Sequence, residues 1–125
     1  MNRRTLRIFF ALLIVGGCNI IFEDDLSEDS ITINMPVDGT VTLDQSQLFW
    51  WEMLDGALGY NLQIVQGTFE NPSHLVVDTS AASDKILFDL LPGQYEWRIN
   101  GWNNYSETEY MYQMLTIEDS AAYEK

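Results

Sequence analysis

The chain has 125 residues and a formal charge of −13, because nineteen Asp and Glu oppose only six Lys and Arg. Such an acidic surface repels the phosphates of nucleic acids and anionic lipids, so we expect no binding to DNA or RNA. Aromatic residues make up 13% of the chain and occur throughout it, which predicts one small folded domain rather than disorder.

The first eighteen residues have the layout of a bacterial export signal. Residues 3–7 contain three arginines, residues 8–15 are apolar, and Gly16 and Gly17 precede Cys18, the single cysteine of the chain. This order of charged, apolar and small residues is typical of a cleaved signal. Its end resembles the lipobox of bacterial lipoproteins. The resemblance implies cleavage between Gly17 and Cys18, a diacylglyceryl group on the Cys18 thiol, and acylation of the new N-terminus, for example with palmitate.

Two other interpretations of this segment are an uncut membrane helix and an ordinary secretory signal. A spanning helix needs about 20 apolar residues, whereas the run from Ile8 reaches only Phe22 and is interrupted at residues 16–19. Lipidation is therefore favoured, and it predicts a protein bound to a membrane of the bacterial cell envelope. We expect the outer membrane rather than the inner one, because Asn19 is not the aspartate that retains some lipoproteins at the inner membrane.

Residues 18–30 are predicted to form a tether between the anchor and the domain. Five acidic residues lie between positions 23 and 29, and their mutual repulsion favours an extended, solvated segment. At about 3.3 Å per residue such a segment reaches roughly 40 Å. At the other end of the chain, residues 118–125 read as a polar tail.

Between these ends the sequence alternates in short segments typical of β-strands. Turn residues such as Pro36, Asp38-Gly39, Gly56 and Gly59 separate the segments. Seven strands in such an arrangement predict a sandwich or a small barrel. The segments are residues 31–34, 48–51, 60–66, 75–77, 86–88, 95–100 and 110–117.

The alternation also predicts which side chains face the core, because successive residues of a strand point to opposite faces. Outward positions are expected to hold Asn61, Gln63, Glu96, Arg98 and Asn100. Inward positions are expected to hold Phe49, Trp51, Tyr60, Leu62, Ile64, Tyr95, Trp97, Ile99, Leu115 and Ile117.

Two motifs resemble those of bacterial fibronectin type III domains. The first is Trp51, followed by Gly56-Ala57 and the Tyr-x-Leu-x-Ile strand at residues 60–64; the second is the Leu-x-Pro-Gly-x-Tyr-x-Trp-Arg-Ile run at residues 90–99. The resemblance implies an all-β, seven-stranded immunoglobulin-like sandwich over residues 31–117. It also implies a tyrosine corner, in which the Tyr95 hydroxyl bonds to backbone near the turn at residues 90–92.

The residues needed for common catalytic centres are missing from the sequence. His74 is the only histidine and is expected to be a solvated loop residue, while Cys18 is assigned to lipidation. Ser-His, Cys-His and zinc chemistry therefore lack their parts. We expect no enzyme activity, no cofactor and no metal site.

The candidate binding surface is the loop at residues 102–107. Tyr, Trp, Asn and Ser are frequent in binding loops, and aromatic faces beside amides suit sugar rings. In the predicted fold this loop shares one pole with residues 52–59, with residues 79–84 and with the start of the first strand. The loop either contacts a ligand or only caps the sandwich. The candidate contact residues are Trp102, Asn103, Asn104, Tyr105, Met53 and Leu54.

The sequence thus predicts a lipid-anchored, non-enzymatic interaction module of a cell-envelope complex. Because the anchor and the loop share a pole, a membrane-protein partner is favoured. The alternative is a carbohydrate-binding accessory lipoprotein that uses the aromatic loop. Two Asp-Ser-Ile/Ala triplets, at Ser30 and Ser120, resemble an acceptor motif for bacterial O-glycosylation.

Overall fold

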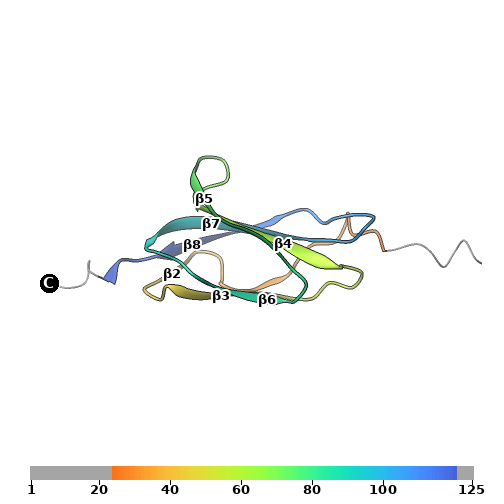
Figure 1. Ribbon diagram of the computed structural model, residues 1–125, viewed down its shortest axis with the longest axis horizontal. Helices are drawn as coiled ribbons and strands as arrows, with labels where there is room; N and C mark the ends of the chain where they lie inside the picture. The colour runs from red at the N-terminus through yellow and green to blue at the C-terminus, as the bar shows by residue number, and fades with distance from the viewer. Residues whose placement is uncertain (1–23, 121–125) are drawn as a thin grey trace, which may run out of the picture.

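The computed structural model of the protein describes residues 24–120, which form a two-layered β-sandwich (Figure 1). The prediction of an all-β fold is confirmed. The described residues form eight strands: β1 (Ile33–Met35), β2 (Thr40–Thr42), β3 (Ser46–Trp51), β4 (Gly59–Gly67), β5 (Pro72–Ala81), β6 (Lys85–Asp89), β7 (Gly93–Trp102) and β8 (Met111–Ile117).

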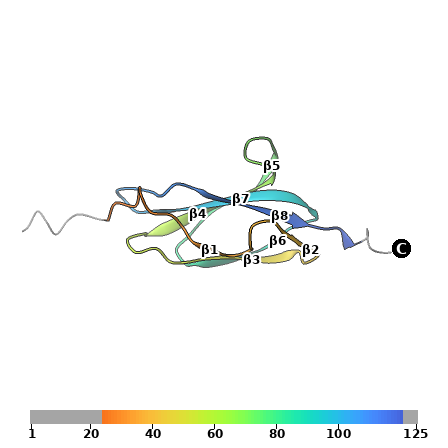
Figure 2. The same cartoon turned by 180° about the vertical axis from the view of Figure 1, so that it is seen from behind.

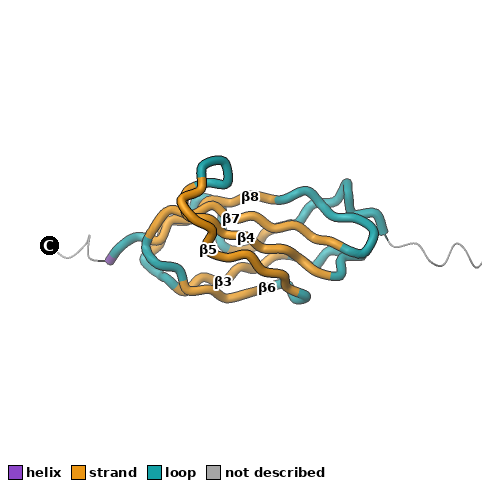
Figure 3. The backbone as a smooth tube through the Cα atoms, turned by 45° about the horizontal axis from the view of Figure 1, so that its top comes forward, coloured by secondary structure: helices purple, strands orange, loops and turns teal. Residues whose placement is uncertain are grey.

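The strands divide into a smaller and a larger sheet. The smaller sheet has the order β1-β3-β6 and the larger one β2-β8-β7-β4-β5, with every pair antiparallel except β2 and β8. Figure 2 shows the two sheets stacked, with β1, β3 and β6 below β4, β7 and β8, and Figure 3 shows the strands of both sheets in a tilted view. The described chain enters at one end of the sandwich and leaves at the opposite end, so each end is a separate pole (Figure 1).

The first predicted strand, residues 31–34, overlaps β1 of the smaller sheet, and a second short strand, β2 of the larger sheet, follows it. Strand β1 pairs with β3. The chain then passes the cis Met35–Pro36 bond and turns at Gly39, whose φ of 80° suits a residue without a side chain. It then joins β8 as the parallel strand β2. Asp38 fixes this turn, because its carboxylate accepts a hydrogen bond from the Met114 backbone N–H (2.7 Å). The three-residue strand β2 was not predicted.

The core lies between the two sheets and is rich in aromatic rings. All ten side chains predicted to face inward are buried, together with Ile31 and Leu90. Phe49 of β3 meets Trp97 of β7 edge to face, with ring centroids 4.8 Å apart. Trp51 and Tyr60 make a second contact across the layers at 5.5 Å. Alternation therefore predicted the core correctly.

One predicted outward residue is buried, contrary to expectation. Asn100 is only 1% exposed. Its amide donates a hydrogen bond to the backbone carbonyl of Thr108 (3.3 Å), and Thr108 in turn bonds to Gly101 through its hydroxyl and its N–H. The segment after β7 therefore covers the Asn100 side chain, which is buried although it points away from the core.

The strand predicted at residues 75–77 is part of the longer strand β5. Its residues pair with β4 from Tyr60 to Gly67, with two register shifts. His74 therefore lies in a strand, opposite Gln66, and not in the expected loop, although its side chain is exposed as expected. The loop between β4 and β5 rises above the larger sheet (Figure 1).

The implied tyrosine corner is present. The Tyr95 side chain is buried, and its hydroxyl donates a 2.6 Å hydrogen bond to the carbonyl of Leu91, in the turn before β7. Burial also raises the pKa of Tyr95 above its usual value.

Replacing Tyr95 by phenylalanine is expected to lower the free energy of unfolding by about 1 kcal/mol at neutral pH, because one hydrogen bond is lost. The variant should also be less sensitive to alkali. In the wild type the unfolded tyrosine ionises first, at a pKa of about 10, so stability falls as the pH rises beyond that value. Urea unfolding at neutral pH and at high pH measures both effects. An equal loss of stability with pH in both proteins would contradict this role of Tyr95.

Candidate functional site

The chain reaches the sandwich through a docked segment, residues 24–30, which contradicts the expected solvated tether. Leu26 is fully buried, and its backbone N–H donates a hydrogen bond to the Ser106 hydroxyl (2.8 Å). The Asp29 N–H closes a turn by bonding to the Leu26 carbonyl, and the Ser27 N–H lowers the pKa of the exposed Asp25 carboxyl. The acidic residues stay exposed, but one apolar side chain among them anchors the segment.

Asn103 holds this docked segment against the candidate loop. Its side chain is buried, and its amide nitrogen donates to the backbone carbonyls of Asp24 (2.8 Å) and Gly56 (3.1 Å). Its side-chain oxygen accepts hydrogen bonds from the backbone N–H groups of Tyr105 and Ser106. One amide thus joins three segments at this pole: the docked segment, the β3–β4 loop and the β7–β8 loop. The predicted shared pole is confirmed.

The other candidate residues divide between packing and exposure. The Trp102 ring lies against the backbone of Gly59, where an added Cβ would come within 2.5 Å of the ring. Leu54 packs partly on the core. By contrast, Tyr105 is 65% exposed and Met53 is 59% exposed, and Asn104 is also at the surface. Trp102, Asn103 and Leu54 therefore serve as a cap, while Tyr105, Met53 and Asn104 remain accessible at the pole.

A second surface, which the sequence analysis did not single out, surrounds Arg98 on the outer face of the larger sheet. The guanidinium carbon lies 4.3 Å from the Phe69 ring centroid and 4.2 Å from that of Tyr110. The side chain also donates hydrogen bonds, from Nε to Gln63 Oε1 (2.7 Å) and from Nη1 to the Tyr112 hydroxyl (3.1 Å). Stacking and hydrogen bonds together hold the arginine in one conformation.

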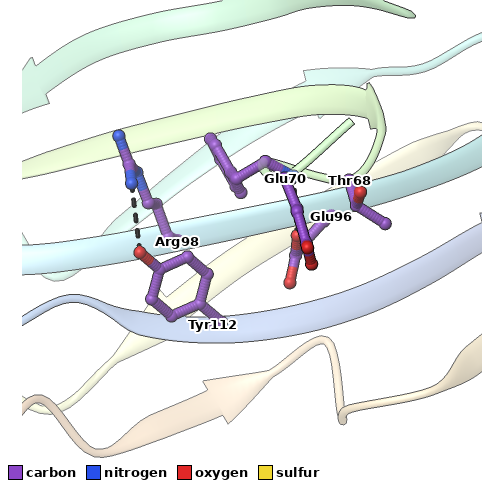
Figure 4. Close-up of a pocket in the computed structure, with 6 residues that line it drawn as sticks. Thr68, Glu70, Glu96, Arg98 and Tyr112 are labelled. Carbon is purple, nitrogen blue, oxygen red and sulfur yellow. Dashed lines mark hydrogen bonds between the residues drawn. The ribbon is translucent and has the colours of Figure 1, made fainter. Parts of the chain in front are cut away.

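Beside Arg98 lies an open hollow of about 480 Å³, shown in Figure 4. Glu96 forms part of it, and one of its carboxylate oxygens accepts a hydrogen bond from the Phe69 backbone N–H (2.8 Å). This bond ties the β4–β5 loop down to β7. The hollow, which we call the Arg98 hollow, is lined by Thr68, Phe69, Glu70, Glu96, Arg98 and Tyr112.

Comparisons with known proteins bear on the fold. No family model matches the chain, and no curated protein matches it. Among solved structures, the fn3 domain of the human collagen alpha-1(XX) chain superposes with a TM-score of 0.56, at 14% identity, over 75% of this chain and 90% of that domain. The structure of FN3tt mut gives 0.50, at 15% identity, over 72% of this chain and 99% of that one. The fold is a fibronectin type III-like sandwich.

The remaining predicted sites lie at the edges of this fibronectin type III-like sandwich. Ser30 and Ser120 are both exposed. Gly17 and Cys18 fall outside the described residues, so the lipidation site stays a prediction.

Within residues 24–120 no group of three or more acidic, histidine or cysteine side chains is placed to hold a metal ion. In the same range, no helix has the length and apolar character that crossing a bilayer requires.

Proposed function

We propose that this chain is a lipid-anchored, non-enzymatic interaction module of the bacterial cell envelope. The lipobox-like sequence ending at Cys18 supports the anchor, and the fibronectin type III-like fold supports a scaffold that presents a binding surface. We further propose that the anchor lies in the outer membrane and that the partner is an envelope protein.

The observation that carries this proposal is the docking of residues 24–30 at the pole of the β7–β8 loop. The hydrogen bond from Asn103 to the Asp24 carbonyl fixes the chain at that point. With acyl chains on Cys18, the six residue steps to Asp24 reach at most about 20 Å, at about 3.3 Å per residue. This is half the length expected for a free tether, so the pole would be held close to the bilayer.

A short connection favours a partner that is itself in the membrane. Tyr105 and Met53 are the exposed candidates at this pole, and side chains of these types are enriched at protein interfaces. The acidic residues around them oppose direct contact with an anionic lipid surface. We therefore assign this pole to a membrane-protein partner rather than to a glycan, since Trp102 and Asn103, the residues best suited to a sugar, are occupied in packing.

The anchor is tested in cells fed an alkyne fatty acid. The wild type is expected to take up the label and to fractionate with the outer membrane, whereas Cys18→Ala is expected to lose the label. Unlabelled wild-type protein, or label that persists in Cys18→Ala, would rule out lipidation at Cys18.

The partner surface is tested with a photoreactive amino acid. Placed at Tyr105, it is expected to form a discrete cross-linked product with another envelope protein. The matched control is Leu91, which is 75% exposed in the turn between β6 and β7, away from the docked segment, and is expected to give no such product. Cross-linking from Leu91 but not from Tyr105 would contradict the assignment of the pole.

A further inference from the structure

The Arg98 side chain is held in one conformation, although side chains at a protein surface are usually mobile. Arg98 is held between the rings of Phe69 and Tyr110 and is hydrogen-bonded to Gln63 and Tyr112. A long, flexible side chain loses conformational entropy when it is fixed in this way. A ligand that binds there meets a side chain already in place, which removes that entropic cost from binding.

The fixed arginine retains hydrogen-bonding capacity. A guanidinium has five N–H donors, and the two hydrogen bonds that the described residues form with Arg98 use the Nε–H and one Nη1–H. The other donors lie on Nη1 and Nη2, at the side of the hollow where Figure 4 shows Arg98 facing Tyr112.

The other side of the hollow supplies hydrogen-bond acceptors. One oxygen of Glu96 receives the Phe69 N–H, and a carboxylate can accept further hydrogen bonds at its second oxygen. Glu70 adds a second carboxylate and Thr68 a hydroxyl, both lining the same space (Figure 4). Tyr112 lies on the Arg98 side of the hollow, and its ring is nearly half exposed (Figure 4).

The charges select among possible ligands. One guanidinium with two carboxylates makes the hollow net negative, in a chain with a large excess of acid, and this disfavours an anionic ligand. A cationic ligand would meet Arg98, which already occupies the aromatic faces. A neutral ligand whose hydroxyls both donate to the carboxylates and accept from the guanidinium fits these groups, and its apolar face suits the Tyr112 ring.

We infer that the Arg98 hollow binds a neutral glycan, with Arg98, Glu70 and Glu96 bonding to sugar hydroxyls and Tyr112 stacking on a sugar ring. The hollow is within the size range of small-molecule sites. This inference rests on the proposed role as an interaction module and adds a second binding surface on the side of the sandwich, distinct from the pole.

The test uses the full chain in detergent and affinity gels that contain neutral polysaccharides of glucose, galactose, mannose or N-acetylglucosamine. The wild type is expected to be retarded by at least one of these polysaccharides. Tyr112→Ala is expected to weaken binding about tenfold or more, which corresponds to about 1.4 kcal/mol. The matched control is Trp50→Ala, a half-buried aromatic on β3 of the other sheet, which is expected to bind as the wild type does.

A second variant guards against misfolding. Glu70→Gln removes one charge from an exposed loop residue with little change of shape, and is expected to weaken binding several-fold while the melting temperature is unchanged. No retardation of the wild type by any of the four polysaccharides, or equal retardation of Tyr112→Ala, would overturn the inference. Stronger retardation by heparin than by the neutral gels would overturn it too.

The two proposals fail separately. Glycan binding is measured without a membrane, and fatty-acid labelling and cross-linking from Tyr105 are measured without added glycan. If the protein takes up the fatty-acid label and cross-links from Tyr105 but no polysaccharide gel retards it, only the glycan site is rejected. If a polysaccharide gel retards the protein but it takes up no label and forms no cross-link, the lipid anchor and the partner surface at the pole are rejected and the glycan site stands.

Discussion

Replacing Trp97 by alanine is expected to remove about 3–5 kcal/mol from the free energy of unfolding, which is enough to unfold much of a small domain. Trp97 is fully buried in the centre of β7 and packs edge to face on Phe49. Truncation therefore removes apolar contacts from both sheets and leaves a cavity between them. Chemical unfolding followed by circular dichroism measures the loss.

A tryptophan on the surface provides the matched control for Trp97. Trp50 is half-buried on β3, where the Lys85 ammonium lies 5.7 Å from its ring centroid. Trp50→Ala removes the same atoms from a partly hydrated site, so a loss of about 1 kcal/mol or less is expected. A loss in Trp97→Ala no larger than that in Trp50→Ala would show that the aromatic layer between the sheets is not the main source of stability.

The core was predictable from the sequence because β3, β4 and β7 each have one buried face. A shift of one residue would bring the whole apolar set of such a strand to the surface, so the pattern fixes the register. Strand β2 offered no comparable signal. Its three residues, Thr40–Thr42, gain their strand geometry by pairing with β8, which is more than seventy positions away in the sequence.

The errors arose where one segment covers another. Composition predicted a solvated tether because acidic residues surround Leu26, but one buried apolar side chain and the hydrogen bonds to Ser106 and Asn103 dock this segment. The alternation likewise predicted that Asn100 points away from the core, but it gave no sign that Thr108 lies over this side chain. Such coverage depends on loop paths, which local periodicity does not encode.

The candidate sites were predictable to different degrees for the same reason. Alternation correctly directed Arg98 and Glu96 outward on neighbouring positions of one face. It carried no information on the fold-back of the β4–β5 loop, which brings Phe69 to Arg98 and to Glu96. At the pole, residue type identified the loop. It did not show whether an asparagine such as Asn103 is buried and bonded to three segments or exposed and free to contact a ligand.

Asn103→Ala is expected to destabilise the domain by about 2–4 kcal/mol, because it removes hydrogen bonds from two carbonyls and two backbone N–H groups, although the Asp24 carbonyl keeps one from the Ser106 hydroxyl. Water can reach some of these groups at the pole, which keeps the loss below the sum for fully buried ones. The matched control is Asn34→Ala, which removes one exposed hydrogen bond to Glu52 and is expected to change stability by about 0.5 kcal/mol or less.

The same variant separates local from global roles of the pole. Loss of the Asn103 amide removes the shorter of two hydrogen bonds to the Asp24 carbonyl (2.8 Å, against 3.3 Å from the Ser106 hydroxyl). Cleavage after Glu28 by a glutamate-specific protease is therefore expected to speed up under conditions in which the sandwich stays folded. Asn103→Asp retains an acceptor for the Tyr105 and Ser106 N–H groups but directs a carboxylate at the carbonyls of Asp24 and Gly56. It should therefore release the docked segment while preserving the β7–β8 turn. Cleavage at the wild-type rate in both variants would mean that Leu26 and the Ser106 hydroxyl hold the segment without Asn103, and that the pole stays near the anchor in its absence.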